Sequence, residues 1–342
     1  MSRAQLTSTV EQNSAGAAAP VVAGKNAVTN GAFDIAQRGT SFTPTGSAYT
    51  FDRWYYNGAT SGMTLTQQSS GLANTRYNIR YQRNSGSAVT TTTGIAQPIE
   101  TAAAILLAGQ TVTLSFYARA GANFSAASSF LGVQVFAGTG TDQNPYTGYT
   151  GQTIPINSGV NITTSWARYS FTTTLAGTIT ELTPNFYWTP VGTAGTNDYF
   201  EITGVQLELG SVATPFSRAG GTVQGELALC QRYFAKSYEL GTAPGSTTRA
   251  GCFVTVGTGA VSRPISMIQL PVRMRTPPGV TLYAPDSGTS GKMRDMSAGA
   301  DVAAANWIVG DDNANDLSVY PNGVSVTSNN YLGIHWTASA EL

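Results

Sequence analysis

Few residues in this chain could carry out acid-base or nucleophilic chemistry. Its 342 residues include one histidine, His335, and two cysteines, Cys230 and Cys252. A Ser-His-Asp triad would have to be built on His335, and no G-x-S-x-G, Walker or G-x-G-x-x-G segment accompanies it. We therefore interpret His335 as a half-buried residue of the last predicted strand, and we expect no catalytic residue and no cofactor.

A metal site is not expected either, because a structural zinc ion needs about four ligands at set spacings. Cys230 and Cys252 could form one disulfide, although a free cysteine is commonly a small buried hydrophobe. Asp311, Asn313 and Asn315 alternate as in the first half of a calcium-binding loop. The segment lacks the glycine and the glutamate of the second half of such a loop, so we interpret it as a solvated turn.

Glycoside hydrolysis requires two carboxylates about 5–10 Å apart. Glu201 and Glu208 lie too far apart along one predicted strand to form such a pair. We therefore favour a protein without enzymatic activity. An enzyme that degrades glycans, a glycan depolymerase, ranks third, after the two non-enzymatic functions given below.

Aromatic and planar polar side chains offer binding chemistry instead. Sugars are held by aromatic faces together with amide, carboxylate or guanidinium groups. Tyr117 and Arg119 share one face of a predicted strand and suit this purpose. The remaining glycan-binding candidates are Trp54, Tyr56, Tyr81, Tyr187 and Trp188. The alternative for each candidate is packing in a core or in a subunit contact, and it applies above all to Trp54.

The composition excludes several partners. Only 11% of the residues are charged, and 18 basic residues balance 18 acidic ones. Such a chain offers no basic surface for a nucleic-acid backbone or for an anionic membrane. The longest apolar run, Ala102–Ala108, is far shorter than the ~20 residues of a spanning helix. Met1–Lys25 has no basic start followed by an apolar segment, so we expect no secretory signal.

The elements that would position these residues are short strands. In Thr111–Ala118 the apolar side chains of Val112, Leu114 and Phe116 alternate with polar ones, which indicates a half-buried strand. Further strands are expected at Tyr49–Tyr56, Tyr77–Arg83, Leu131–Phe136, Ala167–Thr174, Asn185–Trp188 and Tyr199–Leu209. Together they predict an all-β fold with a jelly-roll β-sandwich.

The apolar residues of Tyr199–Leu209 change parity at Gly204. One extra residue there keeps both apolar sets on the core side, so we predict a β-bulge at Thr203–Gly204. The polar residues of the strand would then face outward, either to solvent or in a ligand or cation site; they are Glu201, Gln206 and Glu208.

The pattern changes to a helical period between residues 220 and 240. Val223, Leu227, Cys230 and Phe234 are spaced 4, 3 and 4 residues apart, and Thr222 is placed to cap the first turn. This apolar stripe could pack on a neighbouring domain. It could equally pack on the same helix of two other subunits, because the spacing matches the core positions of a coiled coil.

Four segments follow from these patterns. Residues 1–25 form an arm without apolar periodicity, residues 26–219 the jelly roll, residues 220–240 a helical linker, and residues 241–342 a smaller C-terminal β domain. In this last segment, strands are expected at Gly251–Val256, Ile265–Met274, Val280–Ala284, Asn306–Val309, Leu317–Tyr320, Gly323–Thr327 and Tyr331–Trp336. Leu317–Tyr320 and Gly323–Thr327 would turn at Pro321-Asn322.

Motifs spread along the chain resemble bacteriophage tail-fibre and related virion proteins. Asn30–Gly39, Phe42 and Tyr49–Trp54 are similar to the opening of a module of these proteins, and Ile202–Gly210 with Pro215-Phe216 is similar to its closing strand. The segments similar to the following linker and to the usual C-terminus are Leu227–Phe234 and Ala338–Leu342. The resemblance covers residues 26–342 and implies a virion protein that assembles as a homotrimer.

The first domain also resembles the jelly rolls of carbohydrate-binding modules. Leu106–Gly121 and Thr164–Thr172 are similar to core strands of that fold. These strands define the scaffold and not the sugar site, so the resemblance assigns no sugar-contacting residue.

Residues and resemblance together predict a tail fibre or receptor-binding protein on the phage tail or particle surface. It would be made in the host cytoplasm, join other virion proteins through residues 1–25 and bind host surface polysaccharide with the jelly roll or the C-terminal domain. The alternative is a head decoration, head-fibre or baseplate protein that binds other virion proteins only.

Overall fold

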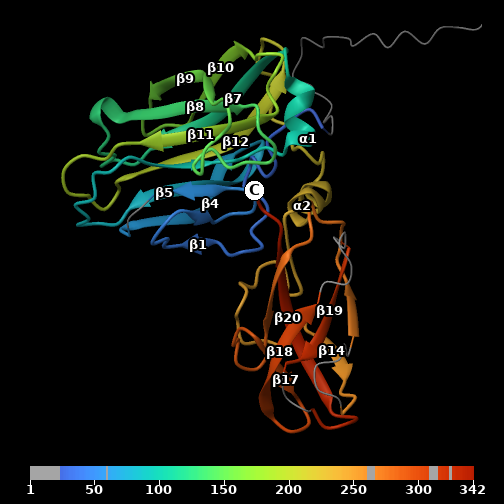
Figure 1. The fold of residues 1–342 in the computed structure, drawn as a ribbon. Helices are drawn as coiled ribbons and strands as arrows, with labels where there is room; N and C mark the ends of the chain where they lie inside the picture. The colour runs from blue at the N-terminus through green and yellow to red at the C-terminus, as the bar shows by residue number, and fades with distance from the viewer. Residues whose placement is uncertain (1–23, 59–60, 260–265, 308–314, 323–325) are drawn as a thin grey trace, which may run out of the picture.

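The computed structural model describes residues 24–58, 61–259, 266–307, 315–322 and 326–342. Figure 1 shows a β-sandwich, the short helix α2 beside it, and an elongated β domain beyond that helix. All strand pairs are antiparallel, which confirms the predicted all-β fold with its jelly-roll sandwich and its smaller C-terminal β domain.

Two six-stranded sheets form the sandwich. In spatial order the first sheet contains β1 (Ser41–Phe42), β4 (Met63–Leu72), β5 (Thr75–Arg83), β12 (Tyr199–Leu209), β7 (Thr111–Ala120) and β10 (Ala167–Thr174). The second sheet contains β2 (Ala48–Tyr49), β3 (Tyr55–Asn57), β6 (Thr93–Ala96), β11 (Glu181–Trp188), β8 (Phe130–Gly138) and β9 (Thr153–Asn161).

The core between the sheets contains four of the residues predicted to bind glycans. Trp54, Tyr56, Tyr81 and Trp188 are all 0% exposed. The Tyr81 ring is stacked 5.8 Å from Tyr56, and the Trp188 ring is stacked 4.8 Å from Phe124. Other side chains cover these rings, and removing their apolar area from water stabilises the sandwich. The prediction that these four residues contact a glycan is therefore wrong.

The predicted bulge in β12 is confirmed. The pairing of β12 with β7 shifts register between Thr203 and Gln206, and Gly204 has φ +60°, which suits a glycine. The bulge keeps Phe200, Ile202, Val205 and Leu207 in the core. The outward polar residues do not face solvent, because neighbouring side chains and loops cover Glu201, Gln206 and Glu208.

The segment Tyr49–Tyr56 is not one strand. Arg53 adopts φ 71°, and the Trp54 amide donates to the Phe51 carbonyl, so a turn separates β2 from β3. The sequence patterns also missed β1, β4, β6 and β9. Other predicted strands of the sandwich lie within a few residues of their expected bounds, and Ala167–Thr174 matches β10 at both ends.

The helices are short, and α1 and α2 lie at the same end of the sandwich (Figure 1). They are α1 (Thr101–Ala104), the 3-10 segments η1 (Ile105–Leu107) and η2 (Ala127–Ser129), and α2 (Val223–Gln231). Thr222 caps α2 as predicted, because its side chain accepts from the Gly225 amide at 3.0 Å. The predicted helical stripe is too long: α2 ends at Gln231, and Phe234 lies in a strand.

The C-terminal domain is built around one strand, β20 (Tyr331–Ser339). Its sheet contains β13 (Phe234–Lys236), β20, β17 (Lys292–Asp295), β18 (Ala300–Trp307), β19 (Asp316–Pro321) and β15 (Ser266–Gln269). β14 (Phe253–Val256) and β16 (Gly279–Tyr283) also pair with β20. Apolar residues including Leu282, Met293, Leu332 and Ile334 form its smaller core. β19 pairs with β15 and β18, and the second arm of the predicted Pro321-Asn322 hairpin falls partly outside the described residues.

Candidate functional site

One candidate surface lies on the outer face of the second sheet. We call it the tyrosine–amide face and define it as Tyr55, Gln134, Tyr146, Asn157, Asn185 and Tyr187. Strands β3, β8, β9 and β11 supply all of these residues except Tyr146, which lies in the loop between β8 and β9. It contains Tyr187, which is the predicted glycan-binding residue that the structure leaves half-buried on this side of the sandwich.

The Tyr187 ring lies against the backbone of the neighbouring strand. Tyr187 pairs with Gly132, and a Cβ atom built on Gly132 would lie 2.3 Å from the ring. Gly94, on the other side of Tyr187, would place a Cβ 3.0 Å from the Tyr187 Cβ. These two glycines leave room for the ring to lie close to the sheet, where the Tyr187 side chain is half-buried.

A chain of amide groups extends across the strands beside this ring. The Asn185 amide donates to Gln134 Oε1 at 3.0 Å, and the Gln134 amide donates to Asn157 Oδ1 at 3.0 Å. The Tyr146 hydroxyl donates to Asn185 Oδ1 at 2.7 Å, and its ring stacks on Tyr55 at 5.6 Å. Burial raises the pKa of Tyr146, so its hydroxyl stays protonated. The face therefore presents rings and amides without a charge.

A second candidate surface lies on the outer face of the first sheet. Arg80, Glu201 and Arg119 occupy one row across β5, β12 and β7. Arg80 bonds one Glu201 oxygen at 2.8 Å, and Arg119 Nε donates to the other oxygen. Tyr199 and Trp166 flank this row, with their ring centres 3.9 Å from the Arg80 Cζ and 4.8 Å from the Arg119 Cζ. The row therefore alternates aromatic and charged groups.

Tyr117 and Arg168 continue this surface beside the row. Tyr117 pairs with Arg168 of β10, whose Cζ lies 5.8 Å from the Tyr117 ring centre. Arg168 Nη2 donates to Ser115 Oγ at 3.0 Å and to the Thr214 carbonyl. We call the seven residues Arg80, Tyr117, Arg119, Trp166, Arg168, Tyr199 and Glu201 the arginine face. Sequence reasoning singled out Tyr117, Arg119 and Glu201, but not that they share one face with the other four residues, because the register of distant strands brings these together.

The other outward residues of β12 have structural partners. Glu208 accepts from the Thr214 amide at 2.9 Å and pairs with Lys25 at 3.3 Å. Burial opposes ionisation of Glu208, but these contacts outweigh it and lower its pKa. Gln206 accepts from the Ser217 amide at 2.7 Å. The two side chains fasten the segment after β12 to the sheet, and neither forms a cation site.

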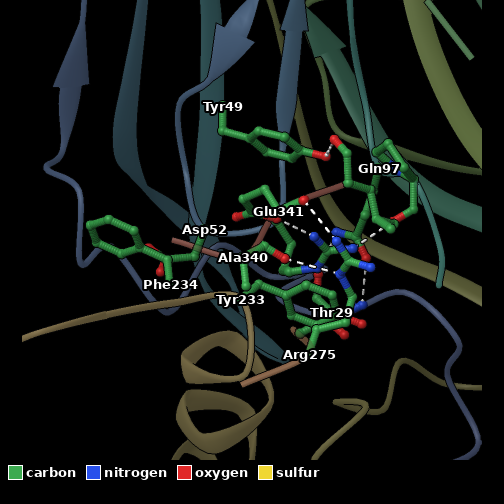
Figure 2. Close-up of polar contacts among 12 residues, drawn as sticks. Thr29, Tyr49, Asp52, Gln97, Tyr233, Phe234, Arg275, Ala340 and Glu341 are labelled. Carbon is green, nitrogen blue, oxygen red and sulfur yellow. Dashed lines mark hydrogen bonds and ion pairs between the residues drawn. The ribbon is translucent and has the colours of Figure 1, made fainter. Parts of the chain in front are cut away.

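Figure 2 shows the junction between the sandwich and the end of the chain. Glu341 lies between Arg38, whose Nη2 is 2.9 Å away, and Arg53, with which it forms an ion pair. Arg53 is only 2% exposed and also lies 3.5 Å from the centre of the Tyr233 ring. The Tyr49 hydroxyl donates to the Leu342 carbonyl at 3.0 Å. Although only 11% of the residues are charged, charged side chains of the sandwich and of the chain end thus join the sandwich to the C-terminal domain.

Further ion pairs reinforce the same junction. Glu100 accepts from Arg232 Nη2 at 2.6 Å and from the Tyr233 hydroxyl at 2.7 Å. Burial alone would raise the pKa of Glu100, but these two donors outweigh it and lower its pKa. Arg275 bonds Asp142 at 2.8 Å and donates to the Ala340 carbonyl at 3.0 Å (Figure 2). The contacts hold the linker and the last residues against the sandwich.

The four residues predicted as a trimer stripe do not share one environment. Cys230 and Phe234 are 1% and 5% exposed and pack within their own chain. Val223 is 43% exposed, and Leu227 is half-buried. The prediction of one continuous stripe on a single helix is therefore wrong, because the chain leaves the helix before Phe234. Val223 and Leu227 remain available for a contact with another subunit.

His335 is a structural residue and is more buried than predicted, with 0% exposure. Its ring stacks on Tyr238 at 3.8 Å, Nδ1 lies 2.9 Å from Ser237 Oγ, and Nε2 lies 3.0 Å from the Thr248 carbonyl. Burial lowers its pKa, which favours the neutral ring. In a Ser-His-Asp triad the carboxylate bonds Nδ1, but here Ser237 Oγ occupies that position and the Thr248 carbonyl faces Nε2.

The remaining candidates concern sulfur and metal chemistry. Cys230 and Cys252 are free thiols, and burial raises the pKa of Cys230. Across the part of the chain that the structure describes, no group of three or more His, Cys, Asp or Glu residues could hold a metal ion. Asp311 and Asn313 of the calcium-like segment lie outside the described residues, as does most of the arm, residues 1–23. No helix within the described ranges is long and apolar enough to cross a membrane.

Comparison with known proteins gives remote structural likenesses. No family model and no curated protein matches the chain. A CBM4 carbohydrate-binding module is similar over 54% of this chain and 99% of its own, with 19% identity and a TM-score of 0.35. A putative sugar-binding protein from Bacteroides thetaiotaomicron has 14% identity over 54% of this chain and 100% of its own, with a TM-score of 0.36.

One similar structure comes from a virus. The enzymatically active domain of tailspike protein 4 of bacteriophage CBA120 has 14% identity and a TM-score of 0.35. The similarity covers 54% of this chain and 21% of the tailspike chain. Likenesses of this degree do not place the chain in a family.

Proposed function

We propose that this chain is a non-enzymatic phage virion protein, a tail fibre or receptor-binding protein, that attaches to host surface glycans as a homotrimer. The observation that carries glycan binding is the tyrosine–amide face. The motifs that resemble virion proteins support the biological setting. Residues 1–25 would join other virion proteins at the tail or on the particle surface, after synthesis in the host cytoplasm.

The chemistry of the tyrosine–amide face suits uncharged sugars. A pyranose ring places its C–H groups on an aromatic face and its hydroxyls on amides, which both donate and accept. Tyr187 supplies the ring, while Gln134 and Asn157 supply amides at the edge of the amide chain. Two glycines fix the height of the Tyr187 ring above the sheet. A site arranged before binding loses little conformational entropy when a ligand arrives.

A trimer would compensate for weak binding by one face. Three linked sites raise the apparent affinity without any new contact in each site. We expect light scattering coupled to size-exclusion chromatography to give three times the chain mass of 35.7 kDa. A stable monomer at micromolar concentration would contradict the trimer.

Removing the Tyr187 ring tests the glycan site. We expect Tyr187→Ala to weaken binding to uncharged polysaccharides on an array about tenfold, which corresponds to ~1.4 kcal/mol for one ring contact. Gly132→Ala should weaken binding similarly, because its methyl group would occupy the place of the ring. The second variant keeps the tyrosine and changes only its position.

Tyr331→Ala is the matched control, since Tyr331 is 60% exposed on the C-terminal domain. It should bind as the unaltered protein does. Equal binding by all four proteins would move the glycan site elsewhere, and no binding by any of them would overturn the proposed glycan attachment. Release of reducing ends from the bound polysaccharide would favour a depolymerase.

A groove at the end of the sandwich favours the second candidate function. It has a volume of about 590 Å³ and is lined mainly by apolar residues, including Leu106, Leu107, Leu209 and Leu229. Leu106 is 73% exposed and Leu209 57% exposed. Exposed apolar surface of this kind suits a protein partner. A head decoration, head-fibre or baseplate protein would use this groove to bind other virion proteins. Particle reconstructions would then place the chain on the head or in the baseplate.

A further inference from the structure

The geometry points to a second binding site: we infer that the arginine face binds a sugar that carries a carboxylate, sulfate or phosphate group. The inference goes beyond attachment through the tyrosine–amide face. The two faces belong to different sheets of the sandwich, so each can be tested without the other. Three properties of the arginine face support the inference: its net positive charge, the guanidinium nitrogens that have no acceptor in the protein, and the contacts that hold the guanidinium groups in place.

The charges on the arginine face do not cancel. Arg80, Arg119 and Arg168 contribute three positive charges, whereas Glu201 contributes one negative charge. Glu201 already pairs with both Arg80 and Arg119. No carboxylate among the described residues forms an ion pair with Arg168. This face therefore attracts an anion, although the whole chain has no net charge.

The guanidinium groups keep donors that the protein does not use. Arg119 Nε donates to Glu201. No described residue accepts a hydrogen bond from the two terminal nitrogens of Arg119. Its side chain is 30% exposed, so these nitrogens can reach a ligand. Arg168 Nη2 donates to Ser115 and Thr214, whereas no described residue accepts a hydrogen bond from its Nη1. Arg168 Nε is shielded from solvent, so a ligand on this surface would bind the terminal nitrogen.

The surroundings hold these donors in place. Glu201 is fully buried and fixes the inner edges of Arg80 and Arg119. The rings of Tyr199 and Trp166 cover the flanks of the two guanidinium groups. The Trp166 indole in turn donates to the Ser70 carbonyl at 3.0 Å. Planar guanidinium groups held in this way bind carboxylate, sulfate and phosphate oxygens with two parallel hydrogen bonds.

The flanking rings favour an acidic sugar over a free anion. Tyr117 is half-buried beside Arg119 and Arg168. A sugar ring can lie on Tyr117 while its acidic substituent reaches the two arginines. Free inorganic anions would gain the charge contacts but not the ring contact.

The test measures binding of the full chain to three immobilised probes: uncharged dextran, dextran sulfate and polygalacturonate. We expect binding to sulfate or carboxylate probes, no binding to dextran through this face, and weaker binding as salt rises from 25 to 300 mM. Arg168→Gln should weaken binding to the acidic probe about tenfold, the loss expected for one charge-assisted hydrogen bond. Arg119→Lys keeps the charge but removes the planar fork, and should weaken it too.

Arg249→Gln is the charge-matched control, because Arg249 is exposed on the C-terminal domain and pairs there with Asp286. It should bind the acidic probe as the unaltered protein does. Equal losses in Arg168→Gln and Arg249→Gln would overturn the inference, as would failure of both acidic probes. Equal competition by single-stranded DNA would also overturn it, since any polyanion would then suffice. The Tyr187→Ala variant should bind the acidic probes normally, so the two sites fail separately.

Discussion

Glu341→Ala is expected to lower the free energy of unfolding by about 3–5 kcal/mol and to uncouple the two domains. The reason is the position of Arg53, which is 2% exposed and pairs with Glu341. Without that carboxylate a buried guanidinium loses its counter-ion and keeps only the Pro98 carbonyl and the Tyr233 ring. Arg38 would lose the same partner.

Urea unfolding followed by tryptophan fluorescence, together with small-angle scattering, measures both effects. We expect the variant to unfold in two separate transitions. We also expect its radius of gyration to be larger than that of the unaltered protein. Asp286→Ala removes a carboxylate that is 22% exposed and pairs with Arg249 and Arg294 at the surface, and it should cost less than about 1 kcal/mol. If Glu341→Ala behaved like this control, the junction would contribute little to holding the domains together.

Asp198→Ala is expected to destabilise the sandwich by a similar amount, about 3–5 kcal/mol. Arg83 and Asp198 are both 0% exposed and lie 2.7 Å apart. Arg83 also donates to the carbonyls of Val89 and Gly192, so it fastens two loops to the end of β5. Loss of Asp198 would leave the guanidinium buried with neutral partners only.

Thermal unfolding would show this as a lower melting temperature for the sandwich. Asp198→Asn keeps the shape and one acceptor and should lose less than Asp198→Ala. The neighbouring Asn197→Ala changes an exposed side chain and should leave the melting temperature within about a degree. A small effect of Asp198→Ala would mean that water reaches Arg83 in the folded protein.

Local patterns in the sequence predicted the strands whose two faces differ in polarity. The alternation of Val112, Leu114 and Phe116 located β7, and the parity change at Gly204 located the bulge. β9 was missed because Pro155 and few apolar residues hide its pattern. The turn inside Tyr49–Tyr56 was missed because it depends on the left-handed conformation of Arg53, for which a non-glycine residue gives no signal.

The candidate sites were harder to predict than the strands. A tyrosine or tryptophan has the same local pattern whether it fills the core, like Tyr81, or lies on a face, like Tyr187. Only the pairing of strands distant in sequence separates these cases. The same pairing joins Arg80 to Glu201 across 121 positions, and no local pattern reports it. The apolar spacing continues past the end of α2 at Gln231, so the predicted stripe included Phe234, which lies in a strand.

The pairing of β20 sets an order for folding during synthesis. Residues up to Leu209 complete both sheets of the sandwich, so this domain can close while the ribosome is still adding later residues. The C-terminal domain cannot close in the same way. β13, β14, β16 and β17 all pair with β20, and each must wait until residues 331–339 have emerged. Until then each of those four strands has an unpaired edge, and unpaired strand edges can pair with other chains.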